Sequence, residues 1–534
     1  MTKFTVLFAT LFAGISLTSA KTSSTEVHYT LHYPNGTTIE ETILPGEPLA
    51  KLEFNDNSYC FMGWYTTEDF AGAPQLTASD TVEGVQDFWA MTLPKDSEGW
   101  CLISNADELY RFAAGVNLPS KNFPDNASFN GKLTADIVVN ENVLDRNGNL
   151  NKGTFRTWTP IGEKNHFTGS FDGNGHTISG LYEDTDADEG SSAFILKMEN
   201  SEGSTPLSIR NLGIKDSYFK GYYSAAGLVV YAYGNPLTIE NSFFEGTVIA
   251  TDLTATGLID IYHSAQNDFT MNNCHFKGKV IAEEYMANGI VSLLDVHHAT
   301  ISNTYVEGEI TADNYAYGIG DVATSLTIAN VYCTAKQKAS YHVAFIGAIL
   351  QTGTIINSYT TTPFIEFFGD DDLGLTKPHL DARTNAKLEV INSYLLYDGP
   401  DMDMVYTGLT VFPLEKFEDG TVANLLQQNC TYGVCGTVWG QDVQKGETYP
   451  SFSGIINKAN VPYSKLTLHT YDTDPNAKHY PSKHILGYKQ LLPSADEVKQ
   501  DGYYFAGWYK SSNFKGTPLT EIDSTETNDV TLYA

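Results

Sequence analysis

The chain has 534 residues, and its formal charge is −32 because it contains 64 acidic and 32 basic side chains. This length is enough for several domains. The acidic excess excludes nucleic acid and anionic lipid surfaces as expected partners, since binding to either depends on Lys and Arg neutralising phosphate.

Residues 1–20 predict a secretory signal peptide. Lys3 precedes an apolar run from Phe4 to Leu17, and Thr18-Ser-Ala20 is a small-residue cleavage site. No later stretch has the roughly 18 consecutive apolar residues that a membrane span needs. We therefore expect a secreted or cell-surface protein without a transmembrane segment.

Two modules with one shared motif are predicted at residues 26–92 and 465–534. Phe61-x-Gly-Trp64-Tyr in the first module is matched by Phe505-x-Gly-Trp508-Tyr in the second, and both continue in the frame F-x-G-W-Y-x4-F-x-G-x-P. Trp64 and Trp508 are expected to fill the core of a small sheet, with a ligand-binding ring as the alternative.

Both modules resemble the Listeria–Bacteroides repeat, also called the internalin B-repeat. The resemblance implies a small β-grasp-like module of bacterial surface proteins. The second module reaches Thr531-Leu-Tyr-Ala534, two residues short of the ending that is usual for such repeats.

A short amphipathic helix is predicted after residue 106. Leu109, Phe112 and Ala113 share one helical face, Asp107 and Glu108 lie in the first turn, and a glycine at 115 is expected to end the helix. Such a helix would plug the open end of a solenoid, whose lumen and strand edge would otherwise meet water.

A five-residue phrase that ends in Asn recurs between residues 207 and 392, beginning with Leu207-Ser-Ile-Arg-Asn211. Its short alternating runs of β-branched and aromatic residues indicate strands, and a repeat of this period indicates stacked units. The sequence therefore predicts an all-β fold, a right-handed parallel β-helix over residues 98–455 with the capping helix, flanked by two β-grasp-like modules. The marker residues are Asn211, Asn241, Asn273, Asn303, Asn330, Asn357 and Asn392.

Stacking gives each repeat column a predicted place. The column two before the marker is apolar from Ile209 to Val390 and should line the lumen. The markers are expected to form a side-chain amide ladder at a left-handed turn. The column two after the marker, from Phe243 to Tyr394, is a predicted ring stack. Ser208 and the five threonines from Thr238 to Thr354 should point outward as a rank of hydroxyls.

Two further phrases resemble bacterial extracellular proteins with a GLUG-type, pectin-lyase-like β-helix. They are Trp158-Thr-Pro-Ile-Gly162 and the glycine-rich run from Phe167 to Leu181. The resemblance implies a surface or secreted location and, in most members, no established catalytic role. The Asp172–Gly175 loop looks like a metal site but is better explained as a tight coil turn.

An insertion at residues 361–386 interrupts the repeat and combines aromatic and acidic side chains. It is the candidate binding surface, with a solvated loop as the alternative. Its candidate residues are Phe364, Phe367, Phe368, Asp370, Asp371 and Asp372.

Six cysteines in an exported chain allow disulfides. Cys430 and Cys435 are the candidate pair for a small loop, and a Cys60–Cys101 bridge is a further possibility. Cys274 and Cys333 would lie two coils apart, about 10 Å by strand spacing, which is too far for a bridge.

No acid–base set or metal-ligand motif can be assembled from the repeats, so no catalytic residue, metal or cofactor is predicted. We expect a non-catalytic surface or adhesion protein whose partner is an extracellular polysaccharide or a host or cell-surface protein. The alternatives are a polysaccharide lyase or glycoside hydrolase on the same scaffold, which would need clustered carboxylates, and a structural spacer between the terminal modules.

Overall fold

The computed structural model describes residues 27–43, 54, 56–70, 86–118, 125–186, 190–199, 206–234, 236–322, 325–346, 348–349, 352–361, 379–380, 387–397, 409–457, 459, 461–470, 480–498 and 500–534. The predicted signal peptide at residues 1–20 lies outside these ranges. In the described part of the chain, no helix has the length and apolarity to cross a membrane.

The N-terminal module forms a four-stranded sheet in the order β2-β1-β4-β3. Strand β1 pairs with β2 in antiparallel and with β4 in parallel orientation. The strands are β1 (Val27–His32), β2 (Thr38–Ile43), β3 (Tyr59–Tyr65) and β4 (Gln86–Pro94).

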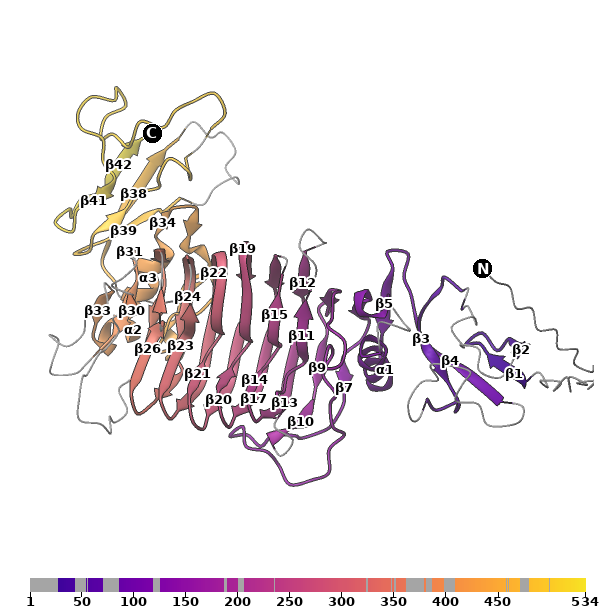
Figure 1. Cartoon of the computed structure of the whole chain (residues 1–534). Coiled ribbons are helices and arrows are strands. Elements are labelled where there is room, and N and C mark those ends of the chain that lie inside the picture. Colours follow the sequence, from indigo (N-terminus) through magenta and orange to yellow (C-terminus); the bar gives the residue numbers. More distant parts are fainter. Residues whose placement is uncertain are drawn as a thin grey trace, which may run out of the picture. The chain divides into compact units, whose positions relative to one another are not determined.

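The centre of the chain is a parallel β-solenoid of about eight turns, confirming the predicted fold class (Figure 1). We number its faces by the order in which each coil passes through them. Face 1 precedes the marker asparagines and contains β5 (Trp100–Ile103), β6 (Asn130–Leu133), β8 (Phe171–Asp172), β12 (Leu207–Arg210), β16 (Leu237–Glu240), the end of β19 (Ile259–Asn272), the middle of β22 (Val291–Ala312), β24 (Leu326–Cys333), β28 (Thr352–Ile356) and β31 (Lys387–Ile391).

Faces 2 to 4 complete each coil. Face 2 contains β7 (Ile137–Val138), β9 (Thr177–Ser179), β10 (Tyr182–Asp184), β13 (Gly213–Gly221), β17 (Phe243–Ala250), β20 (His275–Ala282), the ends of β22 and β24, β25 (Lys336–Lys338), β29 (Tyr359–Thr360), β32 (Tyr394–Leu396) and β33 (Thr410–Phe412). Face 3 contains β14 (Ser224–Ala226), β18 (Thr254–Thr256), β21 (Met286–Asn288), β23 (Tyr315–Val322) and β26 (His342–Ile346). Face 4 contains β11 (Ile195–Glu199), β15 (Val229–Tyr233) and the starts of β19 and β22, while β27 (Ala348–Ile349) pairs with β30 (His379–Leu380).

The apolar column of face 1 lines the lumen. Ile209 pairs with Ile239, and each successive coil continues this register. Ile209, Ile239 and Ile301 are fully buried, whereas Val390 in the last coil is half-buried. Each buried side chain of this size contributes about 1.5–3 kcal/mol, so the column is a major source of stability.

The marker asparagines form a ladder of side-chain amides along the corner between faces 1 and 2. All seven have positive φ, between 43° and 54°. Asn241 Nδ2 donates to Asn211 Oδ1 at 3.0 Å, and Asn357 Nδ2 donates to Asn330 Oδ1 at 2.6 Å. The ladder deviates once, because Asn303 donates to Asn272, not to Asn273. Asparagine tolerates the left-handed conformation that this corner requires, and its amide pairs with the next coil.

The ring column of face 2 points away from the lumen. Its neighbouring centroids lie 4.5 to 5.3 Å apart with interplanar angles of 9° or less, from Phe243 to Tyr359. The segment after β33 covers the last rings and includes α2 (Leu414–Glu418), α3 (Thr421–Gln427), β34 (Cys430–Thr431), β35 (Val434–Cys435), β36 (Gln441–Asp442) and β37 (Ile456–Asn457). Trp439 packs on Tyr332 and Tyr359, and its Nε1 donates to Asn330 at 3.1 Å.

The first helix, α1 (Ala106–Val116), lies where the sequence predicts a cap. Asn105 accepts from the Glu108 backbone N–H at 3.0 Å, and Leu109 and Phe112 are buried. The prediction that Gly115 ends the helix was wrong, because the helix continues to Val116. Gly115 instead allows a close approach: a Cβ there would lie 2.0 Å from the Met62 sulfur.

The C-terminal module repeats the pairing of the first module and packs against the C-terminal cap. Its strand β38 (Tyr463–His469) pairs antiparallel with β39 (Lys483–Ile485) and parallel with β42 (Val530–Tyr533), while β40 (Gln490–Leu491) pairs with β41 (Glu521–Ile522). The Gln428 carboxamide oxygen accepts from the backbone N–H groups of Ser482 and Lys483, both at 3.1 Å.

Two disulfides link Cys60 to Cys101 and Cys430 to Cys435. Cys274 and Cys333 are free and buried, and burial raises the pKa of both thiols, to about 12 and about 11. The two thiols are therefore protonated at neutral pH and poor nucleophiles.

Asp260 is a buried carboxyl in the corner between faces 3 and 4. It is fully buried and accepts from Thr254 Oγ1 at 2.7 Å and Thr256 Oγ1 at 3.0 Å. Burial raises its pKa from 3.8 to about 6, although hydroxyls including those of Ser224 and Ser292 oppose the shift. Glu183 is also buried, and desolvation raises its pKa well above the ordinary value.

Replacing Asn357 by Ala is expected to lower the free energy of unfolding by about 2–4 kcal/mol. The change removes one hydrogen bond from the buried Asn330 amide and one from the half-buried Asn392 amide, and it places an ordinary side chain at a positive φ. Equilibrium unfolding in guanidinium measures the loss. Asn241→Ala, at an exposed rung of the ladder, should lose less, and equal losses would show that buried amide pairing is not what matters.

The Asp260 carboxyl should make stability fall as pH rises from about 4 to about 6. The unfolded side chain ionises first, so the folded state is favoured most below pH 4 and the effect is complete above the folded pKa. Asp260→Asn should remove this fall in the free energy of unfolding, which amounts to about 3 kcal/mol between the two pKa values. Unfolding at pH 4, 5, 6 and 7 tests this, with exposed Asp496→Asn as the control; an unchanged profile would contradict it.

Candidate functional site

The outward side chains of face 1 form a continuous polar row, which we call the hydroxyl rank. Register pairs Ser208 with Thr238, Thr238 with Thr270 and Thr300 with Thr327, and the same column continues toward the N-terminus. Adjacent members lie on neighbouring strands, about 4.8 Å apart. The hydroxyl rank begins at the amide of Asn130 and continues through the hydroxyls of Ser170, Ser208, Thr238, Thr270, Thr300, Thr327 and Thr354.

The middle of the hydroxyl rank is open to a ligand. Its members are all half-buried. Within the described ranges, the hydroxyls of Thr238, Thr270 and Thr300 have no hydrogen-bond partner. Toward the two ends of the rank, hydroxyls already have protein partners. The Ser170 hydroxyl accepts from the Ser208 backbone N–H at 3.0 Å, and His298 Nε2 contacts Thr327 Oγ1 at 3.1 Å. Three adjacent hydroxyls therefore exchange hydrogen bonds with water and are available to a solute.

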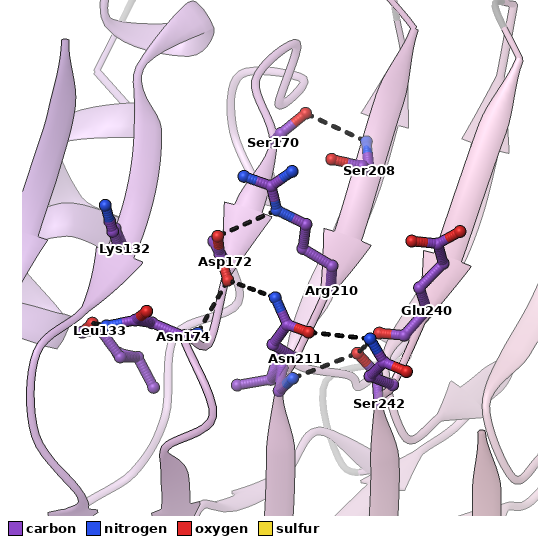
Figure 2. A network of polar contacts seen from close by, with 12 residues as sticks. Lys132, Leu133, Ser170, Asp172, Asn174, Ser208, Arg210, Asn211, Glu240 and Ser242 are labelled. Atoms are coloured by element: carbon purple, nitrogen blue, oxygen red, sulfur yellow. Dashed lines mark hydrogen bonds and ion pairs between the residues drawn. The ribbon is translucent and has the colours of Figure 1, made fainter. Parts of the chain in front are cut away.

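A charged column runs beside the rank at its N-terminal end (Figure 2). Register places Lys132, Asp172, Arg210 and Glu240 on four successive coils, so their charges alternate in sign. Asp172 accepts from Arg210 Nε at 2.9 Å and from Asn211 Nδ2 at 3.1 Å. The ladder of asparagines therefore begins on a carboxylate, which also orients the arginine.

Trp100 closes the N-terminal end of this surface. The Arg210 guanidinium carbon lies 5.4 Å from the Trp100 ring centroid, a distance at which a cation interacts favourably with an indole face. Lys132 pairs with Asp96 at 3.2 Å. Desolvation raises the pKa of Asp96, but hydrogen bonds from the Trp100 backbone and from Lys132 outweigh it, and the pKa is lowered.

This arrangement is suited to hydrogen bonding, and its carboxylate is not arranged as a metal ligand. Asp172 Oδ1 also accepts from the Asn174 backbone N–H at 2.8 Å, so both of its oxygens have protein donors. The part of the chain that the structure describes holds no group of three or more His, Cys, Asp or Glu side chains able to bind a metal ion.

The other predicted site residues lie elsewhere. Trp64 is 3% exposed and packs on Tyr33 and Phe54. Trp508 is 1% exposed, and its Nε1 donates to the Pro493 carbonyl at 2.8 Å. Both indoles therefore lie in module cores. The insertion residues Phe364, Phe367, Phe368, Asp370, Asp371 and Asp372 lie outside the described ranges.

Sequence reasoning missed the N-terminal half of the polar surface. Trp100, Asn130 and Ser170 extend the rank by three coils, but these coils lack a marker asparagine and their strands are short. The signal in the sequence was Ser170-x-Asp172, which has the same spacing as Ser208-x-Arg210. Aligning these two segments residue by residue would have placed Asp172 beside Arg210.

Three comparisons with known proteins bear on this chain. Residues 29–90 and 470–534 match the family model of the Listeria-Bacteroides repeat domain. No curated protein matches the chain. A crystal structure described as "a putative immunoglobulin A1 protease from Bacteroides ovatus" matches with a TM-score of 0.41 and 14% identity, covering 67% of this chain and 94% of that one. A likeness at this level carries no conclusion about activity. Repeats of the matched family are typical of extracellular bacterial proteins, and together with the solenoid they support a bacterial β-helix protein.

Proposed function

We propose that this chain is an exported, non-catalytic surface or secreted protein that binds extracellular glycan through the hydroxyl rank. The observation that carries the proposal is the row of unpaired hydroxyls at Thr238, Thr270 and Thr300, on consecutive strands of one rigid sheet face. The terminal repeats support the extracellular location.

The rank suits a polysaccharide because both are one-dimensional repeats. Each coil presents one hydroxyl at the strand spacing of about 4.8 Å. A sugar chain lying along the axis meets a similar donor and acceptor at each step. The strands hold these groups in place, so few rotamers are immobilised on binding. Specificity would come from matched hydrogen bonds, because a buried polar group left unpaired is unfavourable.

The ligand is expected to be a neutral polysaccharide. The chain carries a formal charge of −32, which repels uronates and sulfated sugars at low ionic strength. The two cations beside the N-terminal end of the rank are already engaged, Lys132 by Asp96 and Arg210 by Asp172. An indole at the end of the rank, Trp100, offers the apolar surface that sugar rings contact.

The triple variant Thr238→Val/Thr270→Val/Thr300→Val should weaken binding of a neutral polysaccharide about tenfold or more. Valine keeps the branched shape and the strand preference of threonine but removes the hydroxyl, and each lost hydrogen bond is worth about 0.5–1.5 kcal/mol. The purified full chain is first screened on immobilised neutral and uronate polysaccharides. The affinity of the triple variant is then measured on the polysaccharide that binds.

Thr467→Val, a half-buried threonine in the C-terminal module, is the matched control and should bind like the wild type. Equal affinity of the triple variant would contradict the proposed site. Release of soluble sugar during the same assay would favour a lyase or hydrolase, and no retention on any surface would favour a structural spacer.

A further inference from the structure

A second surface lies at the turn between faces 2 and 3 of each coil. Backbone hydrogen bonds stack these turns: the Leu253 N–H donates to the Tyr223 carbonyl at 3.0 Å, and the Tyr341 N–H donates to the Asn314 carbonyl at 3.1 Å. We call the stacked positions the tyrosine edge. Its members are Tyr223, Leu253, Tyr285, Asn314 and Tyr341.

The tyrosine edge exposes large side chains on four of five successive coils. Tyr223 is 39% exposed, Leu253 45%, Tyr285 43% and Tyr341 67%. Single exposed apolar side chains are ordinary, but large exposed side chains that recur on stacked turns form one patch, and such a patch marks an interaction site. The row is separate from the buried interior. The last strand residues before these turns, such as Ala250 and Ala282, are buried, whereas the large side chains of the row are exposed.

The rings are supported by one another. Tyr315, one residue after the tip of its own coil, lies 5.6 Å from Tyr285 and 6.3 Å from Tyr341, centroid to centroid. Tyr222 supports Tyr223 in the same way at 4.9 Å. Such contacts reduce ring freedom before any partner arrives, so less conformational entropy is lost on binding.

Three of the five turns are acidic. Asp252 precedes Leu253, Glu283 and Glu284 precede Tyr285, and Asp313 precedes Asn314, while none of the five turns contains Lys or Arg. The strand column near these turns holds Lys220 on the first coil and Lys338 on the last. Lys220 is bound to Asp186 at 2.8 Å and lies 4.0 Å from Glu283, whereas Lys338 is exposed near Tyr341. Glu283, Glu284 and Asp313 are exposed. The carboxylates therefore lie on the three middle coils of the edge, beside Tyr285 and between the coils of Tyr223 and Tyr341.

We propose that the tyrosine edge binds a cationic polypeptide segment, rich in Lys or Arg, of another protein. Ring faces attract ammonium and guanidinium groups through their quadrupole, and the flanking carboxylates pair with the same groups. A second copy of this chain is disfavoured, because it would bring the same acidic turns and a charge of −32 to the interface. The tyrosine edge and the hydroxyl rank lie on different sides of face 2, so this site adds a protein partner to the proposed glycan binding.

The test measures binding of fluorescent decalysine to the full chain by anisotropy, with a neutral Gly-Ser decapeptide for comparison. Tyr285→Leu/Tyr341→Leu keeps the apolar area but removes the ring faces, and it should weaken decalysine binding about five- to thirtyfold. Glu283→Gln/Glu284→Gln should also weaken it and reduce its dependence on salt. The exposed side chains make both variants compatible with folding, which an unchanged thermal unfolding midpoint verifies.

Tyr503→Leu/Tyr504→Leu, in the C-terminal module, is the matched control because both rings are also exposed, 63% and 102%. The proposal holds if only the edge variants lose affinity. It is overturned if edge and control variants bind alike, which would indicate general charge attraction. It is also overturned if decalysine does not bind, or if the Tyr285→Leu/Tyr341→Leu variant instead loses binding to a neutral polysaccharide. The triple valine variant of the hydroxyl rank should still bind decalysine, which separates the two sites.

Discussion

In-register stacking of parallel strands is the constraint on which the rest of this protein depends. Each coil satisfies its backbone groups on the next, so a residue type repeated at one position becomes a continuous row through the solenoid. The asparagine ladder shows what this requires locally. The corner demands a positive φ at every coil, and asparagine meets that demand while its amide pairs with the coil above and below. The buried rungs at Asn330 and Asn357 are also where the C-terminal cap attaches, through Trp439 and Asn330.

The same stacking explains why two different surfaces occur on one scaffold. Alternate residues of face 1 point inward as isoleucine and outward as threonine, so burial of one row necessarily exposes the other. At the opposite end of face 2, the chain leaves the strand for a short turn, and an exposed tyrosine recurs there without any role in the lumen. One row offers hydroxyls and the other offers ring faces among carboxylates. Their chemistry therefore suits different partners, a neutral glycan and a cationic peptide.

Several features depend on contacts between distant segments. Gly115 lies inside α1 because the Met62 side chain fills the space where a Cβ would be. Asp260 falls in an ordinary strand by sequence, yet the bend between faces 3 and 4 surrounds it with hydroxyls and removes water, which raises the pKa. The ring column was predictable as a stack, but its burial was not. Its C-terminal rings are covered by a segment that follows far along the chain, as Trp439 covers Tyr359.

The sequence by itself determined the solenoid, the lumen column, the left-handed asparagine corner and the outward threonines, because a fixed repeat with period-2 alternation leaves one consistent way to bury the isoleucines. It also identified the paired terminal modules through their shared tryptophan motif. Only the tertiary structure decided that Trp100, Asp172 and Arg210 join the hydroxyl rank, and that four turns place Tyr223, Leu253, Tyr285 and Tyr341 in one exposed row. The reason is physical: turn lengths vary by a residue from coil to coil, so these side chains become neighbours through backbone hydrogen bonds between coils and not through spacing along the chain.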